Sequence, residues 1–312
     1  MVEVVRYQPA LAQAWDSFVA QAKNGHFMFT RLYLSYHADR FQDASLLFYY
    51  RGKLVALLPA HQQAQQLISH GGLTFGGLVT GSRMTLGLMQ EVFAALRDFM
   101  WQQGWQELLY RAMPACYHQM PAQEDAAVLY QLGAQLTARQ VTSVIDLQHR
   151  PKYYKGISWS LQKARKGGIR VQPSPDFSGF MQMLTQMLAQ RYQARPVHSL
   201  AEITQLATWF PENIQLWEAR SSAGDLLAGT ILYVTAQTAH TQYIASTAEG
   251  KQQGAVAWLL HSLLAQFGTT KQYFSLGTSR GGAYVNDTLY HFKESLGARA
   301  QLQEQYVWRI NN

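Results

Sequence analysis

The sequence predicts a protein of mixed α/β (α+β) class with two tandem domains. At 312 residues the chain has about twice the length of a common domain. A predicted order of hairpin, strand, helix, strand, helix, strand occurs twice along it. The phrase LYHFKESLGARAQ, residues 289–301, also has a weaker copy in LYQLGAQLTARQ, residues 129–140. Because the offset of about 160 residues exceeds solenoid periods of roughly 20 to 50, these observations favour domain duplication, with chance similarity as the alternative.

Composition indicates a folded protein. Apolar residues make up 48% of the chain and charged residues 14%, a balance that supports a large core and excludes a mostly disordered chain. The stretch MVEVVRYQPALAQAW does not have the pattern of a signal peptide, and no apolar run approaches the roughly 18 to 20 residues that span a bilayer. Cys116 is the only cysteine, and the ten histidines lack metal-ligand spacing. We therefore expect a soluble cytoplasmic protein with no metal site.

The first half, residues 1–148, begins with a predicted helix over 9–23 and a hairpin over 45–63 that turns at Arg51-Gly52. The stretch SHGGLTFGGLV, residues 69–79, follows; no Lys-Ser or Lys-Thr comes after its glycine pairs, so we interpret them as turn and close-approach glycines. Apolar spacing of three and four residues and a final Gly104 predict a helix over 84–104. A strand over 105–113, a helix over 126–133 and a strand over 140–147 complete this half.

The second half, residues 149–312, repeats that order after a basic segment. Helices are predicted over 177–192 and 199–210, and strands over 213–220 and 225–235 flank the turn Ser221–Gly224. A strand over 240–247, a helix over 254–268 and a strand over 272–278 follow. The last elements are a helix over 286–296 and a strand over 303–310. We place the domain boundary at residues 148–149, and the groove between two packed domains is the expected ligand site.

The net charge of +7 is concentrated in one segment. Residues 147–175 contain no carboxylate and seven cations, namely Arg150, Lys152, Lys155, Lys163, Arg165, Lys166 and Arg170. Such a segment attracts phosphates, nucleic acid or an anionic surface, although cations near a helix C-terminus also complement the helix dipole. A phosphate-bearing ligand such as tRNA, a lipid-linked diphosphate or a CoA-type cofactor is compatible with it. Tyr153, Tyr154 and Trp159 interleave with the cations and could stack on bases.

The predicted helix over 286–296 carries the pattern that bears most on function. Asn286 suits the N-cap and Gly297 the C′ position, and Leu289, Phe292 and Leu296 predict the buried stripe. Asn286, Tyr290 and Lys293 are expected together on another face. The alternative is a capped surface helix with a solvated lysine.

The order of strand, glycine-containing loop, helix, strand and Asn-to-Gly helix resembles the acyl-CoA-dependent N-acetyltransferase superfamily (GNAT). HTQYIAST would be the strand beside the acyl group and EGKQQGAVAWLL the loop and helix. The resemblance implies a mixed, mostly antiparallel sheet flanked by helices, with a cofactor pyrophosphate at the helix N-terminus. The cofactor-binding residues that it implies are Tyr243, Ser246, Lys251, Gly254, Ala255 and Asn286.

Lys293 stands where that superfamily often has tyrosine. Its Phe-Lys pair with the Gly-Ala ending, the basic LQKARKGGIRV and the stretch SHGGLTFGGLV resemble instead the FemAB family of tandem GNAT-like proteins. Known members transfer amino acids from aminoacyl-tRNA to cell-wall precursors. The resemblance implies an N-acyltransferase that uses acyl-CoA or aminoacyl-tRNA and acts on an amine of an envelope or polysaccharide precursor. The second domain would be the catalytic, acyl-donor side, and the first a degenerate structural and acceptor side.

Within this resemblance we assign roles to particular residues. Lys293 would clamp the carbonyl or a phosphate, Tyr290 or Ser279 would relay a proton, and backbone N–H groups near Tyr243 would stabilise the oxyanion. The residues expected to bind substrate phosphates are Lys155, Lys163, Lys166, Arg170 and Arg195. Transient association with an anionic membrane surface is a further expectation. The alternative function is a non-catalytic protein that holds RNA or a phosphorylated glycan in its basic groove.

Overall fold

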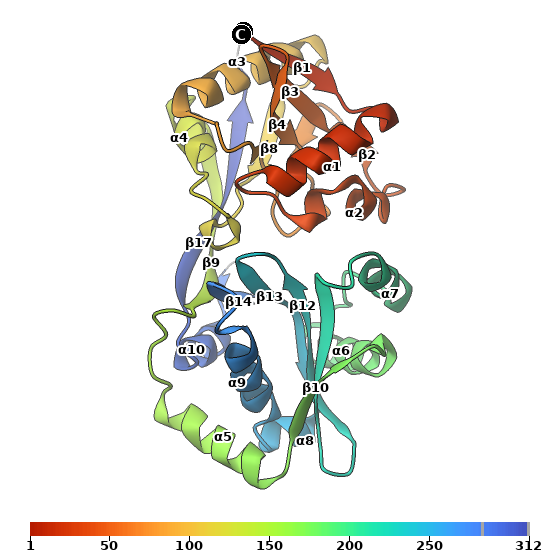
Figure 1. Ribbon diagram of the computed structural model, residues 1–312, viewed down its shortest axis with the longest axis vertical. Coiled ribbons are helices and arrows are strands. Elements are labelled where there is room, and N and C mark those ends of the chain that lie inside the picture. The colour runs from red at the N-terminus through yellow and green to blue at the C-terminus, as the bar shows by residue number, and fades with distance from the viewer. Residues whose placement is uncertain (282–283, 311–312) are drawn as a thin grey trace. The chain divides into compact units, whose positions relative to one another are not determined.

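The computed structural model describes residues 1–281 and 284–310 (Figure 1). The chain divides into two compact units, each with its own core. Unit 1 comprises Met1–Gln140 and the C-terminal segment from Leu302, and unit 2 comprises Val141–Gln301. Two long strands, β9 and β17, run from one unit into the other, so the end of the chain completes unit 1.

Unit 1 contains most of the shorter strands. Its helices and 3-10 helices (η) are η1 (Pro9–Leu11), α1 (Ala12–Gln21), η2 (Phe27–Phe29), α2 (Arg31–Ser35), α3 (Leu86–Gln102), η3 (Ala115–Tyr117) and α4 (Glu124–Gln131). Its strands are β1 (Val2–Arg6), β2 (Gln42–Asp43), β3 (Leu46–Tyr50), β4 (Lys53–Leu58), β5 (His61–Gln63), β6 (Gln66–Ile68), β7 (Val79–Thr80), β8 (Glu107–Arg111) and the first part of β9 (Gln135–Asp146). The second part of β17 (Arg299–Arg309) also belongs to it.

The strands of unit 1 form two groups around one core. The first is an antiparallel sheet in the order β1-β3-β4-β7. The second has the order β17-β8-β6-β5-β2, in which only β6 and β8 pair in parallel. Helix α3 places Val92, Phe93 and Leu96 in the core, where Phe93 meets Trp308 edge to face. Gly104 at φ +73° follows the end of α3, as the sequence predicts, and the side chain of Thr85 caps its start, one residue inside the predicted helix.

Unit 2 contains the remaining helices and strands of the described chain. Its helices are α5 (Lys155–Lys166), α6 (Phe177–Tyr192), α7 (Leu200–Trp209), α8 (Ala248–Gln252), α9 (Ala255–Phe267) and α10 (Asp287–Ser295). Its strands are β10 (Arg170–Ser174), β11 (Ile214–Arg220), β12 (Leu226–Val234), β13 (Thr238–Ser246), β14 (Tyr273–Thr278), β15 (Arg280–Gly281) and β16 (Tyr284–Val285). Helices α6, α7, α9 and α10 and strands β11 to β14 agree closely with the predicted elements, whereas α8, β10, β15 and β16 were not predicted.

One sheet organises unit 2, in the order β10-β11-β12-β13-β14 followed by residues 142–146 of β9. Only β13 and β14 pair in parallel. Helices α6 and α7 lie on one side of this sheet, and α9 and α5 lie on the other (Figure 1). Leu259, Leu260 and Leu263 of α9 pack in the core with Phe274 of β14. The predicted mixed, mostly antiparallel sheet flanked by helices is confirmed.

The repeated phrase of the sequence folds into the same local structure twice. Helix α4 is followed by Gly133 at φ +72° and helix α10 by Gly297 at φ +94°, and a long strand begins next in both cases. The N–H of Ala134 donates to Leu129 O (2.9 Å), and the N–H of Ala298 donates to Lys293 O (3.2 Å). Leu129 and Lys293 therefore occupy equivalent positions before the same helix ending. Over the described ranges of the chain, no helix is long and apolar enough to cross a membrane.

Candidate active site

A fork between β13 and β14 is the central feature of the candidate site in unit 2. The two strands pair in parallel over three residue pairs, the last of which is His240–Ser275. Beyond this point β14 is irregular, because Gly277 has φ +67° and the pairing with β9 shifts between Ser275 and Thr278. β13 is also irregular there, since its register with β12 shifts where Gln242 is inserted. Two adjacent strands that separate in this way expose backbone groups to a ligand.

Lys293 of α10 reaches the irregular end of β14. Its Nζ donates to Gly277 O at 3.0 Å and to Thr278 O at 2.7 Å, and the residue is only 4% exposed. An ammonium has three N–H donors, so one remains for another acceptor. Burial lowers the pKa of Lys293 from 10.5 to about 8. The side chain thus holds the end of β14 in place and keeps an amine that can exchange a proton near neutral pH.

The position of Lys293 corrects the predicted faces of α10. We expected Leu289, Phe292 and Leu296 to form the buried stripe, but Leu289 and Phe292 are half-buried and Lys293 is buried. Residues 289, 293 and 296 are spaced by four and three, so Lys293 lies on the same side of the helix as the two leucines. The two carbonyl groups of β14 compensate its buried charge. The solvated-lysine alternative is wrong for this residue.

Ser279 and Asn286 lie beside Lys293. The N–H of Asn286 donates to Ser279 O at 2.7 Å, and the Asn286 side chain caps α10 by accepting from the N–H of Leu289 at 3.0 Å. Ser279 is 3% exposed, and its Oγ has no hydrogen-bond partner among the residues that the structure describes. A buried hydroxyl is satisfied at best by a hydrogen bond, so Ser279 Oγ has hydrogen-bonding capacity that the described residues do not use. Three of the predicted residues are therefore brought together.

His240 is a member of this cluster that the sequence analysis missed. Its Nδ1 lies 3.1 Å from Ser275 Oγ, and the N–H of Gly277 donates to the same Oγ at 3.3 Å. Burial, and next the charge of Lys293, lower the pKa of His240 to about 4, so the ring is neutral at pH 7. The signal in the sequence was a histidine inside a strand of otherwise apolar and small polar residues. It became informative only once the partner strand was known.

Tyr243 lies further along β13 and contacts the segment before α7. Its Oη lies 2.7 Å from Nδ1 of His198, and its carbonyl accepts from Thr230 Oγ1 at 2.8 Å. Burial raises the pKa of Tyr243 above its ordinary value. Ser246 ends the strand opposite Ala228. Tyr243 and Ser246 are thus on the strand that leaves the fork.

The predicted phosphate loop forms the start of α9. Lys251 is exposed at the end of α8, and Gly254 at φ +75° is the N-cap of α9, with buried Ala255 next. A Cβ on Gly254 would lie 2.6 Å from Ser160 O of α5, so helix packing alone requires this glycine. The first N–H groups of α9, beginning with Ala255, have no partner inside the helix. Such N–H groups at a helix start attract anions in general.

The remaining predicted residues are more dispersed. Tyr290 lies on α10 and is half-buried, and Arg195 is exposed between α6 and α7. The residues expected to bind phosphates are all exposed to solvent. Three of them, Lys155, Lys163 and Lys166, lie on α5, and Arg170 begins β10. No hydrogen bond recorded among the described residues joins any of these side chains to Lys293. Within residues 1–281 and 284–310, no group of three or more His, Cys, Asp or Glu residues is arranged to hold a metal ion.

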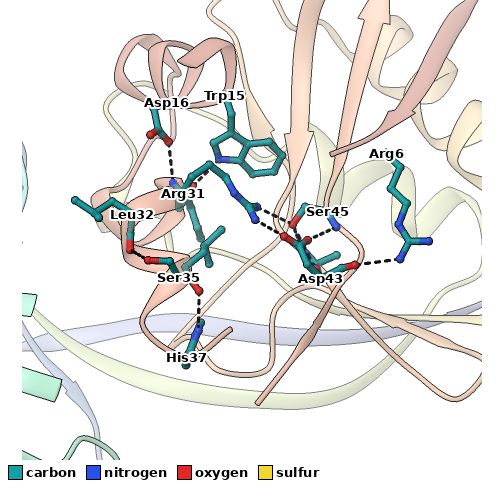
Figure 2. Close-up of polar contacts among 12 residues, drawn as sticks. Arg6, Trp15, Asp16, Arg31, Leu32, Ser35, His37, Asp43 and Ser45 are labelled. Atoms are coloured by element: carbon teal, nitrogen blue, oxygen red, sulfur yellow. Dashed lines mark hydrogen bonds and ion pairs between the residues drawn. The ribbon is translucent and has the colours of Figure 1, made fainter. Parts of the chain in front are cut away.

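Unit 1 has a polar cluster of its own around Arg31 (Figure 2). The Arg31 guanidinium contacts Asp43 and donates to Ser45 Oγ at 3.2 Å, while its backbone N–H donates to Asp16 Oδ1 at 2.8 Å. The guanidinium carbon also lies 3.6 Å from the centroid of the Tyr7 ring. Burial alone would raise the pKa of Asp43, but the charge of Arg31 and hydrogen bonds from Ser45 lower it. These contacts fix α2 against β2 and β3, which is a structural role.

The glycine pairs of unit 1 are also explained by packing. A Cβ on Gly77, which has φ +86°, would lie 2.7 Å from Tyr110 Oη, and a Cβ on Gly72 would lie 2.6 Å from the Phe41 ring. The Tyr110 hydroxyl accepts from the N–H of Leu78 at 2.8 Å. The interpretation of these residues as turn and close-approach glycines is confirmed.

Each unit has a mixed, mostly antiparallel sheet flanked by helices, and in unit 2 the parallel pair β13 and β14 separates at a fork. These features define a FemAB/GNAT-like tandem fold. Solved structures confirm this class. The structure of FemX superposes with a TM-score of 0.68 at 10% identity and covers 98% of this chain and 97% of that chain. L-PGS from Bacillus licheniformis gives a TM-score of 0.61 at 13% identity and covers 98% and 93%.

A third structure is also that of a tandem GNAT protein. The tandem GNAT protein from the clavulanic acid biosynthesis pathway gives a TM-score of 0.54 at 12% identity and covers 100% of this chain and 99% of that chain. By sequence, no protein-family model and no curated protein matches the chain. At these identities the likeness shows the fold, and the chemistry must be argued from the residues of this chain.

Proposed function

We propose that the protein is an N-acyltransferase of FemAB/GNAT type. It transfers an acyl or aminoacyl group, from acyl-CoA or aminoacyl-tRNA, to an amine of a cell-envelope or polysaccharide precursor in the cytoplasm. The observation that carries this proposal is the cluster of Lys293, Ser279 and His240 at the fork of β13 and β14. The likeness of fold to FemX and L-PGS supports it.

The chemistry requires three tasks of the site. The amine nitrogen attacks the acyl carbon, the carbonyl oxygen gains negative charge, and the bond from the carbon to the donor sulfur or oxygen breaks. We assign the stabilisation of the carbonyl oxygen to the third N–H of Lys293, supported by backbone N–H groups of β13 from Tyr243 on. The proton lost by the amine returns to the leaving sulfur or oxygen. We assign this transfer to Ser279 Oγ, which has no hydrogen-bond partner among the described residues.

The lowered pKa of Lys293 suits this role. An ammonium with a pKa near 8 is charged at pH 7 and can stabilise an oxyanion, yet it also gives up a proton more easily than an ordinary lysine. His240 acts as a positioning residue, because its contact with Ser275 helps to hold the N–H of Gly277 and thus the carbonyls that orient Lys293. Tyr290 is a second candidate for the proton relay, on the next turn of the same helix.

Donor binding involves the other predicted residues of unit 2. When bound, coenzyme A supplies the acyl group as a thioester. Its phosphates would be held by the exposed Lys251 and by the N–H groups at the start of α9, which follow Gly254 and begin with Ala255. Asn286 and Ser246 would border the acyl end. For unit 1 we propose the structural and acceptor side, because the position equivalent to Lys293 holds Leu129, which is fully buried in apolar surroundings.

Calorimetric titration with acetyl-CoA and with charged tRNA tests the proposal, at low and at moderate salt so that non-specific attraction is recognised. We expect saturable binding of one donor that persists in salt, and turnover with an amine acceptor. Lys293→Met should retain binding and lose at least about 100-fold in turnover, as when an oxyanion donor is removed. Lys271→Met is the matched control, since Lys271 Nζ also donates to backbone carbonyls, of Thr235 (2.6 Å) and Ala236 (3.4 Å).

The outcomes are distinct. Equal loss of turnover in the Lys293 and Lys271 variants would make Lys293 a structural residue only. Salt-resistant binding of RNA or a glycan without turnover would instead indicate the non-catalytic binding protein. Absence of binding by both donors would overturn the proposal.

A further inference from the structure

Helix α5 presents a row of cations on its outward face. Its buried side is formed by Ile157 and Ala164, which pack into the core of unit 2. Lys155, Trp159, Lys163 and Lys166 follow one another at intervals of four, four and three residues. At about 100° per residue they fall within about 80° of each other, opposite to the buried side. All four are exposed, and together they span about 16 Å of the helix surface at about 1.5 Å per residue.

The cations of this face are not compensated. The three lysines and Arg165 of the same helix form no ion pair that the structure records over the described residues, whereas Lys23, Arg31 and Arg220 each pair with a carboxylate. The sequence from residue 147 to residue 175 supplies no carboxylate that could pair with them. Three of these cations lie in the last turn of this helix of 12 residues, but Lys155 is its first residue, where the helix dipole does not favour a cation, so the dipole does not account for the whole row. The face is therefore a positive patch in need of an anionic partner.

Trp159 is the second observation. Its side chain is 71% exposed at the centre of the patch, with Lys155 and Lys163 one turn away on either side. The other two aromatic residues of the segment each contact a histidine, although Tyr154 remains 44% exposed. Tyr153 Oη lies 2.9 Å from Nδ1 of His261, and the Tyr154 ring lies 5.7 Å from the His291 ring. A single exposed indole is not unusual in itself, but an indole flanked by lysines on one helix face is the combination that suits the interface of an anionic membrane.

We propose that the face of α5 formed by Lys155, Trp159, Lys163 and Lys166 docks on an anionic phospholipid surface. The lysines contact lipid phosphates, and the Trp159 indole enters the headgroup layer, where tryptophan is favoured. This docking does not depend on acyl transfer.

A lipid surface fits this face better than RNA does. Proteins that hold single-stranded nucleic acid combine a positive groove with several aromatic residues on which successive bases stack. Here the cations lie on the outer surface of one helix, which is convex, and Trp159 is the aromatic residue on this face, because Tyr153 is hydrogen-bonded to His261 and Tyr154 is the N-cap residue, more than 100° around the helix from the centre of the face. A plane of anionic headgroups can meet all four side chains of such a surface at once. RNA binding is the competing outcome.

Sedimentation with lipid vesicles tests the proposal on the full chain. The vesicles are phosphatidylcholine alone, and the same lipid with about a quarter phosphatidylglycerol, at low and physiological ionic strength. The variant K155Q/K163Q/K166Q removes three charges from the face. The control K53Q/R83Q/R97Q removes three exposed charges from unit 1, so the net charge of the two variants is equal. All six positions are exposed, and circular dichroism verifies that both variants fold.

We expect binding to the phosphatidylglycerol vesicles only. Each lysine near an anionic surface contributes about a fivefold change in affinity, so the α5 variant should bind about 100-fold more weakly, while the control changes little. Brominated lipids should quench the wild-type fluorescence more than that of Trp159→Phe. The proposal would be overturned if both triple variants lost the same vesicle affinity, or if the wild type did not bind vesicles. Salt-resistant binding of a single-stranded RNA at this face, in place of lipid, would also overturn it.

Discussion

Replacing Lys293 with methionine is expected to change how the stability of unit 2 depends on pH. The amine is buried and its pKa in the folded protein is about 8, compared with an ordinary value of 10.5. Between these two values the unfolded chain holds a proton on Lys293 that the folded chain has released. The free energy of unfolding of the wild type therefore rises with pH in this range. Methionine has a similar length but no proton to release, so the variant lacks this contribution.

The magnitude follows from the two pKa values. They differ by about 2.5, and each pH unit corresponds to about 1.4 kcal/mol, so the full contribution is about 3 kcal/mol. At pH 7 almost none of it is present, and at pH 10 about 2.5 kcal/mol is present. The difference in free energy of unfolding between wild type and Lys293→Met should thus move by about 2.5 kcal/mol in favour of the wild type from pH 7 to pH 10.

Denaturant unfolding of both proteins at a series of pH values measures this difference. Native-state hydrogen exchange of the amides of α10 identifies the transition that belongs to unit 2. Subtracting the two curves removes the titration of groups that the proteins share, including the tyrosines. A difference that stays flat from pH 7 to pH 10 would mean that Lys293 is solvated with an ordinary pKa, and the description of the fork would then be wrong.

Three further substitutions have expected outcomes. His240→Asn should lower acyl transfer about 10- to 100-fold and shift the pH–rate profile, because the positioning of Lys293 is relaxed; an unchanged profile in steady-state kinetics refutes the positioning role. Gly254→Ala should lower the free energy of unfolding by about 1 to 3 kcal/mol, since its Cβ would lie 2.6 Å from Ser160 O at a φ of +75°, and denaturant unfolding equal to wild type would contradict this. Leu129→Lys should cost about 3 to 5 kcal/mol or prevent folding of unit 1, because it buries an unpaired charge in an apolar core; a thermal transition at the wild-type temperature would argue against the equivalence drawn between Leu129 and Lys293.

Local signals in the sequence predicted most of the elements. Asn286 and Gly297 defined both ends of α10, and Gly104 the end of α3, because capping depends on residues within a few positions of each other. The duplicated phrase was also informative, since it marks two helices with the same hydrogen-bonded ending. The resemblance of the motifs to the FemAB family agrees with the fold that the structure shows.

The candidate site was less predictable, because it depends on contacts between distant segments. The fork requires the pairing of β13 with β14, and the burial of Lys293 requires the carbonyl groups of Gly277 and Thr278, which no helical periodicity reveals. His240 could not be distinguished from other buried histidines until its contact with Ser275 was known. Ser160 of α5 explains Gly254 by packing, a contact with a distant segment that neither the phosphate-loop interpretation nor that of an ordinary glycine at a helix start could supply from the sequence.

Hydrogen–deuterium exchange with and without a bound donor tests the central claim most directly, namely that the fork of β13 and β14 is the site of acyl transfer. Acetyl-CoA and aminoacyl-tRNA are each added at concentrations where calorimetry shows binding. The account predicts slower exchange of backbone amides in residues 240–246 and 275–279, and less of this protection in Lys293→Met. Protection by a bound donor that is confined to α5 or to unit 1, with no change at the fork, would contradict it.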